Sequence, residues 1–326
     1  MGDAWRIVVR RTGGPDVLER EEFDPPVPGP GEVLIAQEAI GLNFIDTYIR
    51  SGLYPMPLPG TPGSEAAGRI VDVGSDVEGF APGDRVGYFS GPPGAYTTHR
   101  AYPAAKLVKL PDWLAIDQAA AILLKGCTVE MLVERCARVK AGQWVLVHAA
   151  AGGVGSLLVP WLKAVGAQVI AHAGTAEKAA RARVAGADVA LSCPMDDLAS
   201  AVREATAGAG VATVFDGIGK ASWQASLASL ATTGLLVSFG NASGVADPFT
   251  VLDLMRGGSL FVTRPTQGDY ISTPKTLAWS SGRLFEMIER GTINPLITNR
   301  FDLGKAADAH RALEARQTTG LTVLIP

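Results

Sequence analysis

The sequence predicts an α/β protein with two domains, one mostly β and one built on a doubly wound parallel sheet. The chain has 326 residues, which is too long for one ordinary domain. Residues 1–122 contain short β-rich runs separated by clusters of proline and glycine, as in an all-β domain. From about residue 123, apolar runs alternate with helical stretches, as a buried parallel sheet requires.

In the mostly-β domain, the sequence predicts strands at residues 32–36, 68–73 and 85–89. Beyond about residue 265 it predicts helices at residues 274–290 and 305–316 and a final strand at 321–325. We expect this tail to return to the first domain, which then comprises residues 1–122 and 266–326.

The second domain is expected to span residues 123–265. Its predicted strands lie at residues 144–148, 168–172, 189–192, 212–215, 234–238 and 260–263, and alanine-rich helices are predicted between them, for example at 176–185 and 196–206. Six such strands with interposed helices are typical of a doubly wound dinucleotide-binding fold.

Composition narrows the class of protein. Lys and Arg total 29 against 32 for Asp and Glu, and no basic tract is visible, which argues against a nucleic-acid surface. The three cysteines are scattered and odd in number, which indicates reduced thiols and a cytoplasmic location. Residues 144–162 carry no formal charge, but their glycines and proline favour a strand, a turn and a buried helix over a membrane span.

A glycine turn follows the first predicted strand of the second domain. In the run Ala149-Ala-Ala-Gly152-Gly153-Val154-Gly155, the three positions of the G-x-G-x-x-G pattern are filled by Ala150, Gly152 and Gly155. Such a turn lets backbone N–H groups approach a pyrophosphate, which the start of the next helix also favours. The alternative is a turn that joins strand to helix and binds nothing.

The residues after the second strand indicate which cofactor is preferred. NAD-selective sites usually place Asp or Glu there, whereas this chain has Gly174, Thr175 as an expected helix N-cap, and Lys178 in the first turn. A cation in that turn opposes the helix dipole unless an anion such as a 2′-phosphate lies nearby. The pattern favours NADPH, although Glu177 adjoins the site and a solvated surface lysine is the alternative.

The sequence contains no cluster that suits a metal. None of the four histidines lies near a cysteine at ligand spacing, and the cysteines themselves are not clustered. We therefore expect no metal. Alcohol oxidation needs its developing alkoxide stabilised, whereas a quinone ring already accepts electrons well, so quinone reduction is the favoured chemistry.

Several extended motifs carry a resemblance to a known family. The run Gly41-Leu-Asn43-Phe-Ile-Asp46-Thr-Tyr48-Ile-Arg50 resembles the signature loop of the NADPH:quinone oxidoreductases, the zeta-crystallin-like, zinc-free branch of the medium-chain dehydrogenase/reductase superfamily. Residues 13–18, 83–86, 124–128, 238–244 and 262–265 resemble the family as well. The resemblance implies a GroES-like catalytic domain, assembled from both chain ends, and a Rossmann domain that binds NADPH.

The resemblance also implies roles for individual residues. Asn43 and Thr128 match neighbours of the nicotinamide, and Tyr48 and Tyr54 match aromatic residues that line the quinone site. The remaining cofactor contacts implied by position are Gly152, Gly153, Val154, Gly174, Lys178, Phe239, Asn241, Arg264 and Arg316. From the residues alone, the two tyrosines could equally be packing residues, and Asp46 and Arg50 could pair with each other on a helical turn.

Two departures from relatives accompany these matches. Gly63-Ser64-Glu65 stands where zinc-dependent relatives have a Gly-His-Glu motif, so the histidine ligand is replaced. Cys193 stands where the family often has a tyrosine near the adenosine phosphate, which changes part of the expected 2′-phosphate environment.

The expected reaction is reduction of quinones by hydride transfer from the nicotinamide C4 of NADPH, without zinc. One rival is NADPH-dependent reduction of the double bond of enones or alkenals. A second is a non-enzymatic role as a crystallin or an RNA-binding protein, which the intact glycine turn and the acidic balance disfavour. The resemblance to the family also implies a homodimer, formed along the edge strand near residues 260–263.

Overall fold

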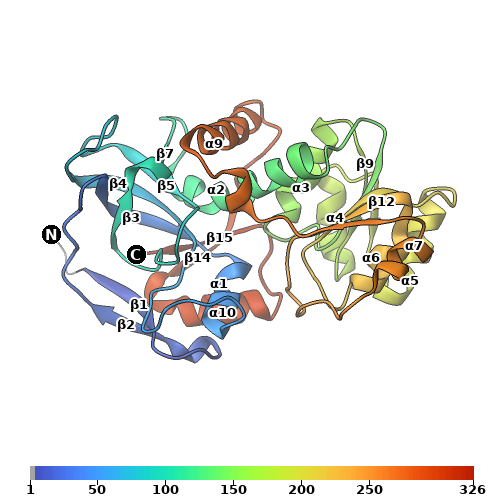
Figure 1. Cartoon of the computed structure of the whole chain (residues 1–326), viewed down its shortest axis with the longest axis horizontal. Coiled ribbons are helices and arrows are strands. Elements are labelled where there is room, and N and C mark those ends of the chain that lie inside the picture. The colour runs from blue at the N-terminus through green and yellow to red at the C-terminus, as the bar shows by residue number, and fades with distance from the viewer. Residues whose placement is uncertain (1–3) are drawn as a thin grey trace. The chain divides into compact units, whose positions relative to one another are not determined.

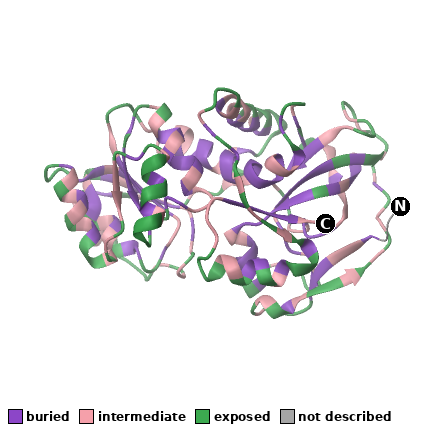
Figure 2. Ribbon diagram, turned by 180° about the vertical axis from the view of Figure 1, so that it is seen from behind, coloured by how far each residue is buried: buried purple, intermediate pink, exposed green. Residues whose placement is uncertain are grey.

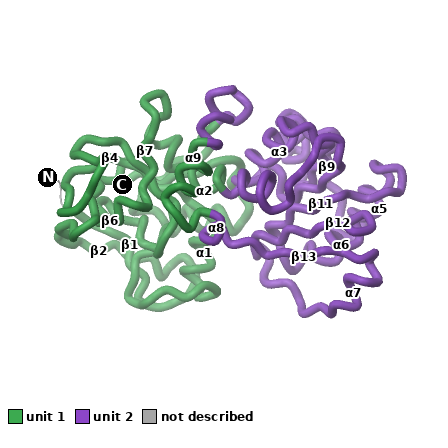
Figure 3. Tube along the Cα trace, turned by 45° about the horizontal axis from the view of Figure 1, so that its top comes forward, with its two compact units in different colours: residues 1–127, 271–282, 295–326 green, residues 128–270, 283–294 purple. Residues whose placement is uncertain are grey.

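The computed structural model describes residues 4–326, which divide into two compact units (Figure 3). Unit 1 contains the described residues up to Cys127 together with Ile271–Gly282 and Pro295–Pro326, and unit 2 contains Thr128–Tyr270 and Arg283–Asn294. The division falls within two helices, α2 (Ile116–Glu130) and α9 (Pro274–Glu289). Unit 1 therefore combines segments from both parts of the chain, as Figure 3 shows by colour.

Unit 1 is built on a mainly antiparallel sheet, labelled in Figure 1. Its strands are β1 (Trp5–Val9), β2 (Leu18–Glu22), β3 (Glu32–Gly41), β4 (Glu65–Val73), β5 (Arg85–Tyr88), β6 (His99–Pro103), β7 (Val108–Lys109), β14 (Ile297–Asp302) and β15 (Leu321–Ile325). Seven of them form one sheet in the order β14-β15-β3-β4-β5-β7, with β6 paired to β3, while β1 and β2 form a separate pair. The last strand, β15, pairs with the end of β3.

The helices of unit 1 pack around this sheet and its core. Besides its parts of α2 and α9, unit 1 contains α1 (Phe44–Ser51) and α10 (Ala306–Glu314), with the short 3-10 helices η1 (Pro15–Val17), η2 (Ala104–Lys106) and η4 (Leu303–Lys305). The apolar core includes Val33, Ile35, Tyr88 and Leu324, all fully buried. Helix α1 starts directly after β3, because Asn43 is extended and caps it, and it ends at Gly52 in the left-handed conformation (φ 87°).

Unit 2 has a six-stranded, fully parallel sheet in the order β10-β9-β8-β11-β12-β13. Its strands are β8 (Trp144–Val147), β9 (Gln168–His172), β10 (Val189–Leu191), β11 (Val211–Asp216), β12 (Leu230–Ser238) and β13 (Phe261–Thr263). Each overlaps one of the six predicted strands. In order along the chain this arrangement is 3-2-1-4-5-6, the doubly wound order of dinucleotide-binding folds, so the predicted fold class is confirmed.

Helices connect the parallel strands of unit 2. They are α3 (Gly155–Ala164), α4 (Ala176–Val184), α5 (Met195–Ala205), α6 (Trp223–Ser229) and α7 (Val251–Arg256). Helix α8 (Gln267–Tyr270) follows the last strand, and α2 continues into a π-helical segment (Met131–Cys136). Figure 2 shows buried strands between them, and Leu146, Ile170 and Val214 pack against α5 and α6 in one core. The uncharged stretch 144–162 forms β8, a turn and part of α3, as predicted. No helix within residues 4–326 has both the length and the apolar character needed to cross a membrane.

Candidate active site

Most of the predicted cofactor-binding residues lie at one edge of the unit 2 sheet. Because all six strands are parallel, their carboxyl ends share that edge. The glycine turn follows β8, Gly174 and Lys178 follow β9, Phe239 and Asn241 follow β12, and Arg264 follows β13. At the neighbouring strands β8 and β11 the strand order reverses, which is where such sheets bind ligands.

The glycine turn after β8 has the close packing that a pyrophosphate-binding loop needs. A Cβ on Gly155 would clash with the carbonyl oxygen of Ala149 and would lie 2.6 Å from the Cα of Ala150, so only glycine fits there. Ala150, at the first position of the pattern, is 1% exposed. Among the described residues, no side chain caps the start of α3. The loop therefore fits a phosphate held by backbone groups at a helix start.

The segment after β9 contains the residues predicted for a 2′-phosphate site, at the start of α4. Thr175 caps α4 by accepting a hydrogen bond from the backbone N–H of Lys178 at 3.2 Å. Gly174 is exposed, and a Cβ added to it would meet no atom of residues 4–326 within 4 Å. Glu177, whose negative charge adjoins the proposed 2′-phosphate site, forms an ion pair with Arg181 at 2.9 Å. Lys178 is half-buried in the first turn, where an anion would offset its opposition to the helix dipole.

The ends of β12 and β13 form a polar corner at the same edge. The guanidinium of Arg264 donates to the carbonyl oxygens of Ser238 at 3.2 Å and Gly240 at 3.0 Å. In the amide orientation that satisfies both neighbours, Asn241 donates to Gly240 and accepts from Arg264 at 3.2 Å. The ring of Phe239 lies 3.0 Å from a Cβ position on Gly217. These hydrogen bonds join Asn241 to Arg264, and Phe239 directly precedes Gly240 in the same turn.

Three other residues singled out in the sequence are Thr128, Cys193 and Arg316. Thr128 lies in the last turn of α2, and its hydroxyl accepts from the Gln267 amide at 3.1 Å. Cys193, the departure from the family pattern, uses its carbonyl oxygen to bind His172 Nε2 at 3.0 Å, and burial raises the pKa of its thiol. Arg316 belongs to unit 1, where it is exposed in the turn between α10 and β15 at φ 58°. Its predicted role at the cofactor stays a prediction.

The predicted residues of unit 1 gather around α1. Asn43 is 5% exposed, and its side-chain amide donates to Glu65 Oε1 at 2.8 Å. Glu65 is fully buried at the start of β4. It also accepts from the Lys125 ammonium at 2.9 Å and from the backbone N–H of Leu124 at 2.7 Å. A buried ion pair thus fixes the side chain of Asn43.

The two predicted tyrosines are in contact with each other. The rings of Tyr48 and Tyr54 meet edge to face with centroids 5.4 Å apart, and Phe44 lies 5.7 Å from Tyr48. Tyr48 is 7% exposed and Tyr54 is half-buried. The structure therefore brings together the aromatic residues expected to receive the substrate ring.

The pairing of Asp46 with Arg50, which their helical spacing had suggested, does not form. Asp46 accepts from Ser64 Oγ at 2.6 Å, from the backbone N–H of Asn43 at 2.9 Å and from Tyr96. Arg50 instead forms a salt bridge with Glu314 at 2.6 Å. Burial raises the pKa of Asp46 to about 7. Asp46 and Arg50 thus form hydrogen bonds and ion pairs with residues from other segments of the chain and not with each other.

Sequence reasoning did not identify Glu65, Lys125, Tyr96 or His310 as parts of this arrangement. One signal was available for Lys125, because it follows an apolar stretch on a helix and a buried ammonium needs an anionic partner. No local signal pointed to His310, whose contact with Arg50 spans 260 residues.

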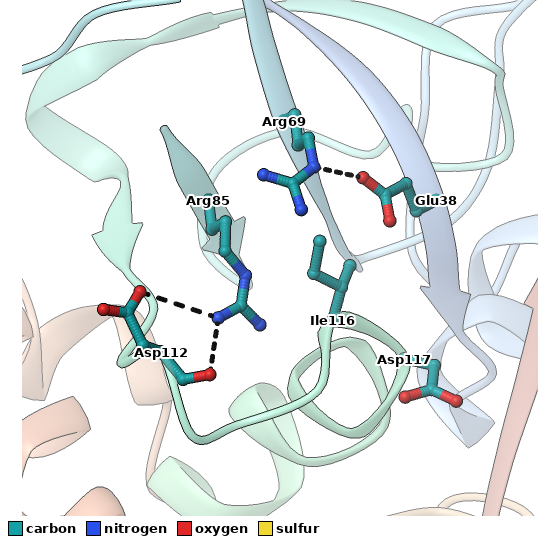
Figure 4. Close-up of a pocket in the computed structure, with 6 residues that line it drawn as sticks. All are labelled: Glu38, Arg69, Arg85, Asp112, Ile116 and Asp117. Atoms are coloured by element: carbon teal, nitrogen blue, oxygen red, sulfur yellow. Dashed lines mark hydrogen bonds and ion pairs between the residues drawn. The ribbon is translucent and has the colours of Figure 1, made fainter. Parts of the chain in front are cut away.

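A separate hollow on unit 1 contains none of the predicted site residues (Figure 4). It has a volume of about 420 Å³ and is lined by Ile116 and five charged residues, Glu38, Arg69, Arg85, Asp112 and Asp117. Arg69 pairs with Glu38 at 3.1 Å, and Asp117 pairs with Arg300 at 2.6 Å. The charges lining this hollow largely satisfy one another.

Two family models match the chain. One is described as an alcohol dehydrogenase GroES-like domain and matches residues 29–112, and the other is described as a zinc-binding dehydrogenase and matches residues 153–278. Within residues 4–326, however, no group of three or more His, Cys, Asp and Glu side chains could hold a metal ion.

Similar proteins extend the match over the whole chain. A quinone oxidoreductase of Pseudomonas aeruginosa is 48% identical over 324 residues, covering 99% of this chain and 100% of that protein. A 2-haloacrylate reductase of a Burkholderia species is 42% identical, covering 98% of each. The crystal structure of Escherichia coli quinone oxidoreductase complexed with NADPH matches with a TM-score of 0.97 at 43% identity, covering 99% of this chain and 100% of that chain.

Fold, site and matched models together define a medium-chain dehydrogenase/reductase. Within that superfamily, full-length identities of 43–48% establish that the chain belongs to the quinone oxidoreductase family, which confirms the resemblance found in its sequence.

Proposed function

We propose that the protein is an NADPH-dependent, zinc-independent quinone oxidoreductase. The observation that carries this is the carboxyl edge of the unit 2 sheet, where a turn with no room for a Cβ at Gly155 follows β8, and Lys178 stands in the first turn of α4 after the neighbouring strand β9. That combination suits a pyrophosphate and a 2′-phosphate in one molecule. The similar Escherichia coli protein was crystallised with NADPH.

The residues present fit NADPH. Gly152, Gly153 and Val154 would hold the pyrophosphate, Gly174 and Lys178 the 2′-phosphate, and Asn43 and Thr128 the nicotinamide. Phe239, Asn241, Arg264 and Arg316 would border the cofactor. When bound, NADPH supplies the hydride that reduces the substrate.

Residue chemistry supports a reaction without zinc. Ser64 and Asn43 offer no anionic or imidazole ligand, and the Glu65 carboxylate already faces the Lys125 ammonium at 2.9 Å. A second cation placed on that carboxylate would meet the repulsion of Lys125. Here the ammonium supplies the fixed positive charge beside Asn43.

The substrate would be a quinone whose ring packs against Tyr48 and Tyr54. Their edge-to-face contact leaves an aromatic surface that suits a flat ring. The buried bond from Asn43 to Glu65 holds the neighbouring polar group still. Alignment of this kind can contribute about 7–11 kcal/mol to the barrier reduction. Reduction of an activated double bond is the second candidate, favoured by the 42% identity to a 2-haloacrylate reductase.

Three further properties belong to this proposal. The catalytic domain would comprise residues 1–122 and 266–326, and the Rossmann domain residues 123–265. A homodimer would form along β13, which ends the sheet and exposes 61% of Phe261. Within residues 4–326, none of the three cysteines forms a disulfide, which supports a cytoplasmic location.

The experiment is steady-state kinetics with NADPH and NADH against a panel of quinones and simple enones, for the wild type and for Lys178→Glu. We expect quinones to be reduced fastest, and the substitution to lower the NADPH-to-NADH ratio of kcat/KM by at least about tenfold, since a carboxylate would repel the 2′-phosphate. Lys140→Glu is the control, because this exposed lysine precedes β8 at the opposite edge of the sheet. An unchanged ratio in Lys178→Glu would remove the coenzyme assignment.

A further inference from the structure

We propose that Asp46 and Ser64 form a proton relay, in which Asp46 stores a proton and the Ser64 hydroxyl delivers it to the substrate oxygen that becomes negative during reduction. This inference rests on the proposed function and adds to it the source of the proton. It is carried by the arrangement of hydrogen bonds around Asp46 in unit 1.

The two oxygens of Asp46 have different partners. Oδ2 accepts from the backbone N–H of Asn43 at 2.9 Å and from the Tyr96 hydroxyl at 3.2 Å. Oδ1 accepts from the Ser64 hydroxyl at 2.6 Å. Because a hydroxyl can both donate and accept, the Oδ1 side can take a proton without losing its hydrogen bond, whereas a proton on Oδ2 would displace a donor.

The Tyr96 hydroxyl donates its hydrogen bond to Asp46 because of its contact with His310, which in turn contacts Arg50. Arg50 can only donate, so His310 Nδ1 accepts its hydrogen bond at 3.1 Å. A neutral His310 then carries its hydrogen on Nε2, and burial beside Arg50 lowers its pKa to about 3. Nε2 therefore donates to the Tyr96 oxygen at 2.8 Å, which leaves the hydrogen of Tyr96 for Asp46. Arg50 is itself held by Glu314 and by the carbonyl of Gly13.

Protonation of Asp46 reverses one hydrogen bond. As a carboxylate, Asp46 accepts from Ser64. As an acid, it donates from Oδ1 to Ser64 Oγ, and the hydroxyl hydrogen of Ser64 becomes free to point elsewhere. Asp46 is fully buried, whereas Ser64 is half-buried and directly precedes Glu65, the partner of Asn43. Ser64 is therefore the member of the pair that a substrate near Asn43 can reach.

The charges facing Asp46 keep this proton available near neutrality. Burial raises its pKa to about 7, Glu65 on β4 acts in the same direction, and Lys125 on α2 opposes it. Its other titratable neighbours are Tyr96, before β6, and, one contact further, His310 on α10 and Arg50 on α1 itself. An acid works best when its pKa lies near the working pH.

The proposed step balances. As the substrate oxygen gains the electron pair left by hydride addition, an O–H bond forms to it and the Oγ–H bond of Ser64 breaks. The proton on Asp46 Oδ1 passes to Ser64 Oγ, which leaves Asp46 as a carboxylate. After product release, Asp46 regains one proton from solvent through Ser64. One proton is consumed per substrate, and the hydride, which carries both electrons, comes from NADPH.

The test uses the full-length enzyme, NADPH and a naphthoquinone, with single-turnover rates measured between about pH 5 and 9. We expect the wild-type rate to be constant below about pH 7 and to fall up to tenfold per pH unit above it, because Asp46 then loses its proton. Asp46→Asn copies the hydrogen bonds of the neutral acid but has no transferable proton. It should lower the low-pH rate by about 10²-fold and give a flat pH profile. The wild-type reaction should be slower in D₂O than in H₂O because a proton is transferred, and this difference should be absent in the variant.

Two further variants separate the relay from a structural role. Ser64→Ala should match Asp46→Asn, and Ser64→Thr, which restores a hydroxyl, should recover most of the rate. Tyr96→Phe removes a donor to the ionised form of Asp46, so it should move the midpoint of the pH profile upward by about one unit. A wild-type pH profile in Asp46→Asn or Ser64→Ala, or an unmoved midpoint in Tyr96→Phe, overturns the relay. Failure of the wild type to oxidise NADPH with any quinone would instead overturn the proposed function.

Discussion

The edge of the unit 2 sheet and the surroundings of α1 in unit 1 are built by different means. At the sheet edge, most of the features that suit a nucleotide are backbone features, namely a turn with no room for a Cβ at Gly155, the start of α3 and the capped start of α4, with the side chain of Lys178 added to them. Around α1, they are buried side chains that carry charge, with Glu65 and Asp46 both fully buried. The first region offers backbone groups to the proposed cofactor, and the second holds its side chains in place.

This difference has an energetic consequence. A backbone turn is sensitive to added volume, because nothing next to it can move aside. A buried charge is sensitive to the loss of its partner, because the charge left behind has no solvent around it. The two regions should therefore respond to opposite kinds of substitution.

The largest expected effect is at the ion pair of unit 1. Lys125→Met keeps the length of the side chain but removes the ammonium that faces Glu65 at 2.9 Å. We expect the free energy of unfolding to fall by about 3–5 kcal/mol, as when one partner of a buried pair is lost. Urea unfolding of the purified protein measures this.

Two controls sharpen this prediction. The double variant Glu65→Gln with Lys125→Met removes both charges and should recover much of the loss, because no unpaired charge stays buried. Glu177→Gln breaks an exposed pair with Arg181 and should change stability by no more than about 0.5 kcal/mol. A loss below about 1 kcal/mol in Lys125→Met would show that the pair does not stabilise unit 1.

The same contrast explains how much could be predicted from the sequence. The six parallel strands and the glycine turn were predictable, because apolar runs, helical stretches and Gly152 to Gly155 are local patterns. Thr175 as the cap of α4 was predictable for the same reason. The roles of Asn43, Tyr48 and Tyr54 came from the family resemblance and stay predictions, although the structure brings these residues together.

The network behind Asn43 was not predictable from local patterns. Its contacts join residues that are far apart in the sequence. Asn43 and Glu65 are separated by 22 positions, Lys125 and Glu65 by 60, and Arg50 and His310 by 260. Local reasoning suggested that Asp46 would pair with Arg50, because i to i+4 spacing brings opposite charges together on a helix. The sheet of unit 1 instead brings Ser64 and Tyr96 to Asp46, and such pairings depend on the complete fold.

A smaller effect is expected at the glycine turn of unit 2. Gly155→Ala places a Cβ within 2.6 Å of two backbone atoms, so the turn has to shift. We expect a loss of about 1–3 kcal/mol in stability, typical of overpacking, and NADPH binding weaker by at least about tenfold. Thermal unfolding and titration of NADPH fluorescence measure the two effects. Gly282→Ala, in α9, has open space around its Cβ and should stabilise by up to about 1 kcal/mol.

The smallest expected effect is a pH dependence that differs between the two regions. In unit 1, burial raises the pKa of Asp46 from 3.8 to about 7 and lowers the pKa of His310 from 6.5 to about 3. In unit 2, burial lowers the pKa of His148 from 6.5 to about 4. Between about pH 4.5 and 6, the native protein therefore holds a proton on Asp46, whereas the unfolded chain holds protons on His310 and His148.

The signs follow from this difference in bound protons. Asp46 stabilises the native state at low pH and loses that contribution as pH rises through its native pKa. The two histidines stabilise it above pH 6.5 and lose that contribution as pH falls. Between about pH 4.5 and 6 the contributions of Asp46 and His310 to the pH dependence are equal and opposite, so they cancel. The contribution of His148 remains, and it should make the free energy of unfolding rise by about 1.4 kcal/mol per pH unit. His310→Gln should lower the measured slope by that amount, and Asp46→Asn should raise it by the same amount. Urea unfolding at pH 5 and pH 6 gives the slopes, and changes of the opposite sign would mean that the buried groups of unit 1 do not hold the protonation states that their surroundings impose.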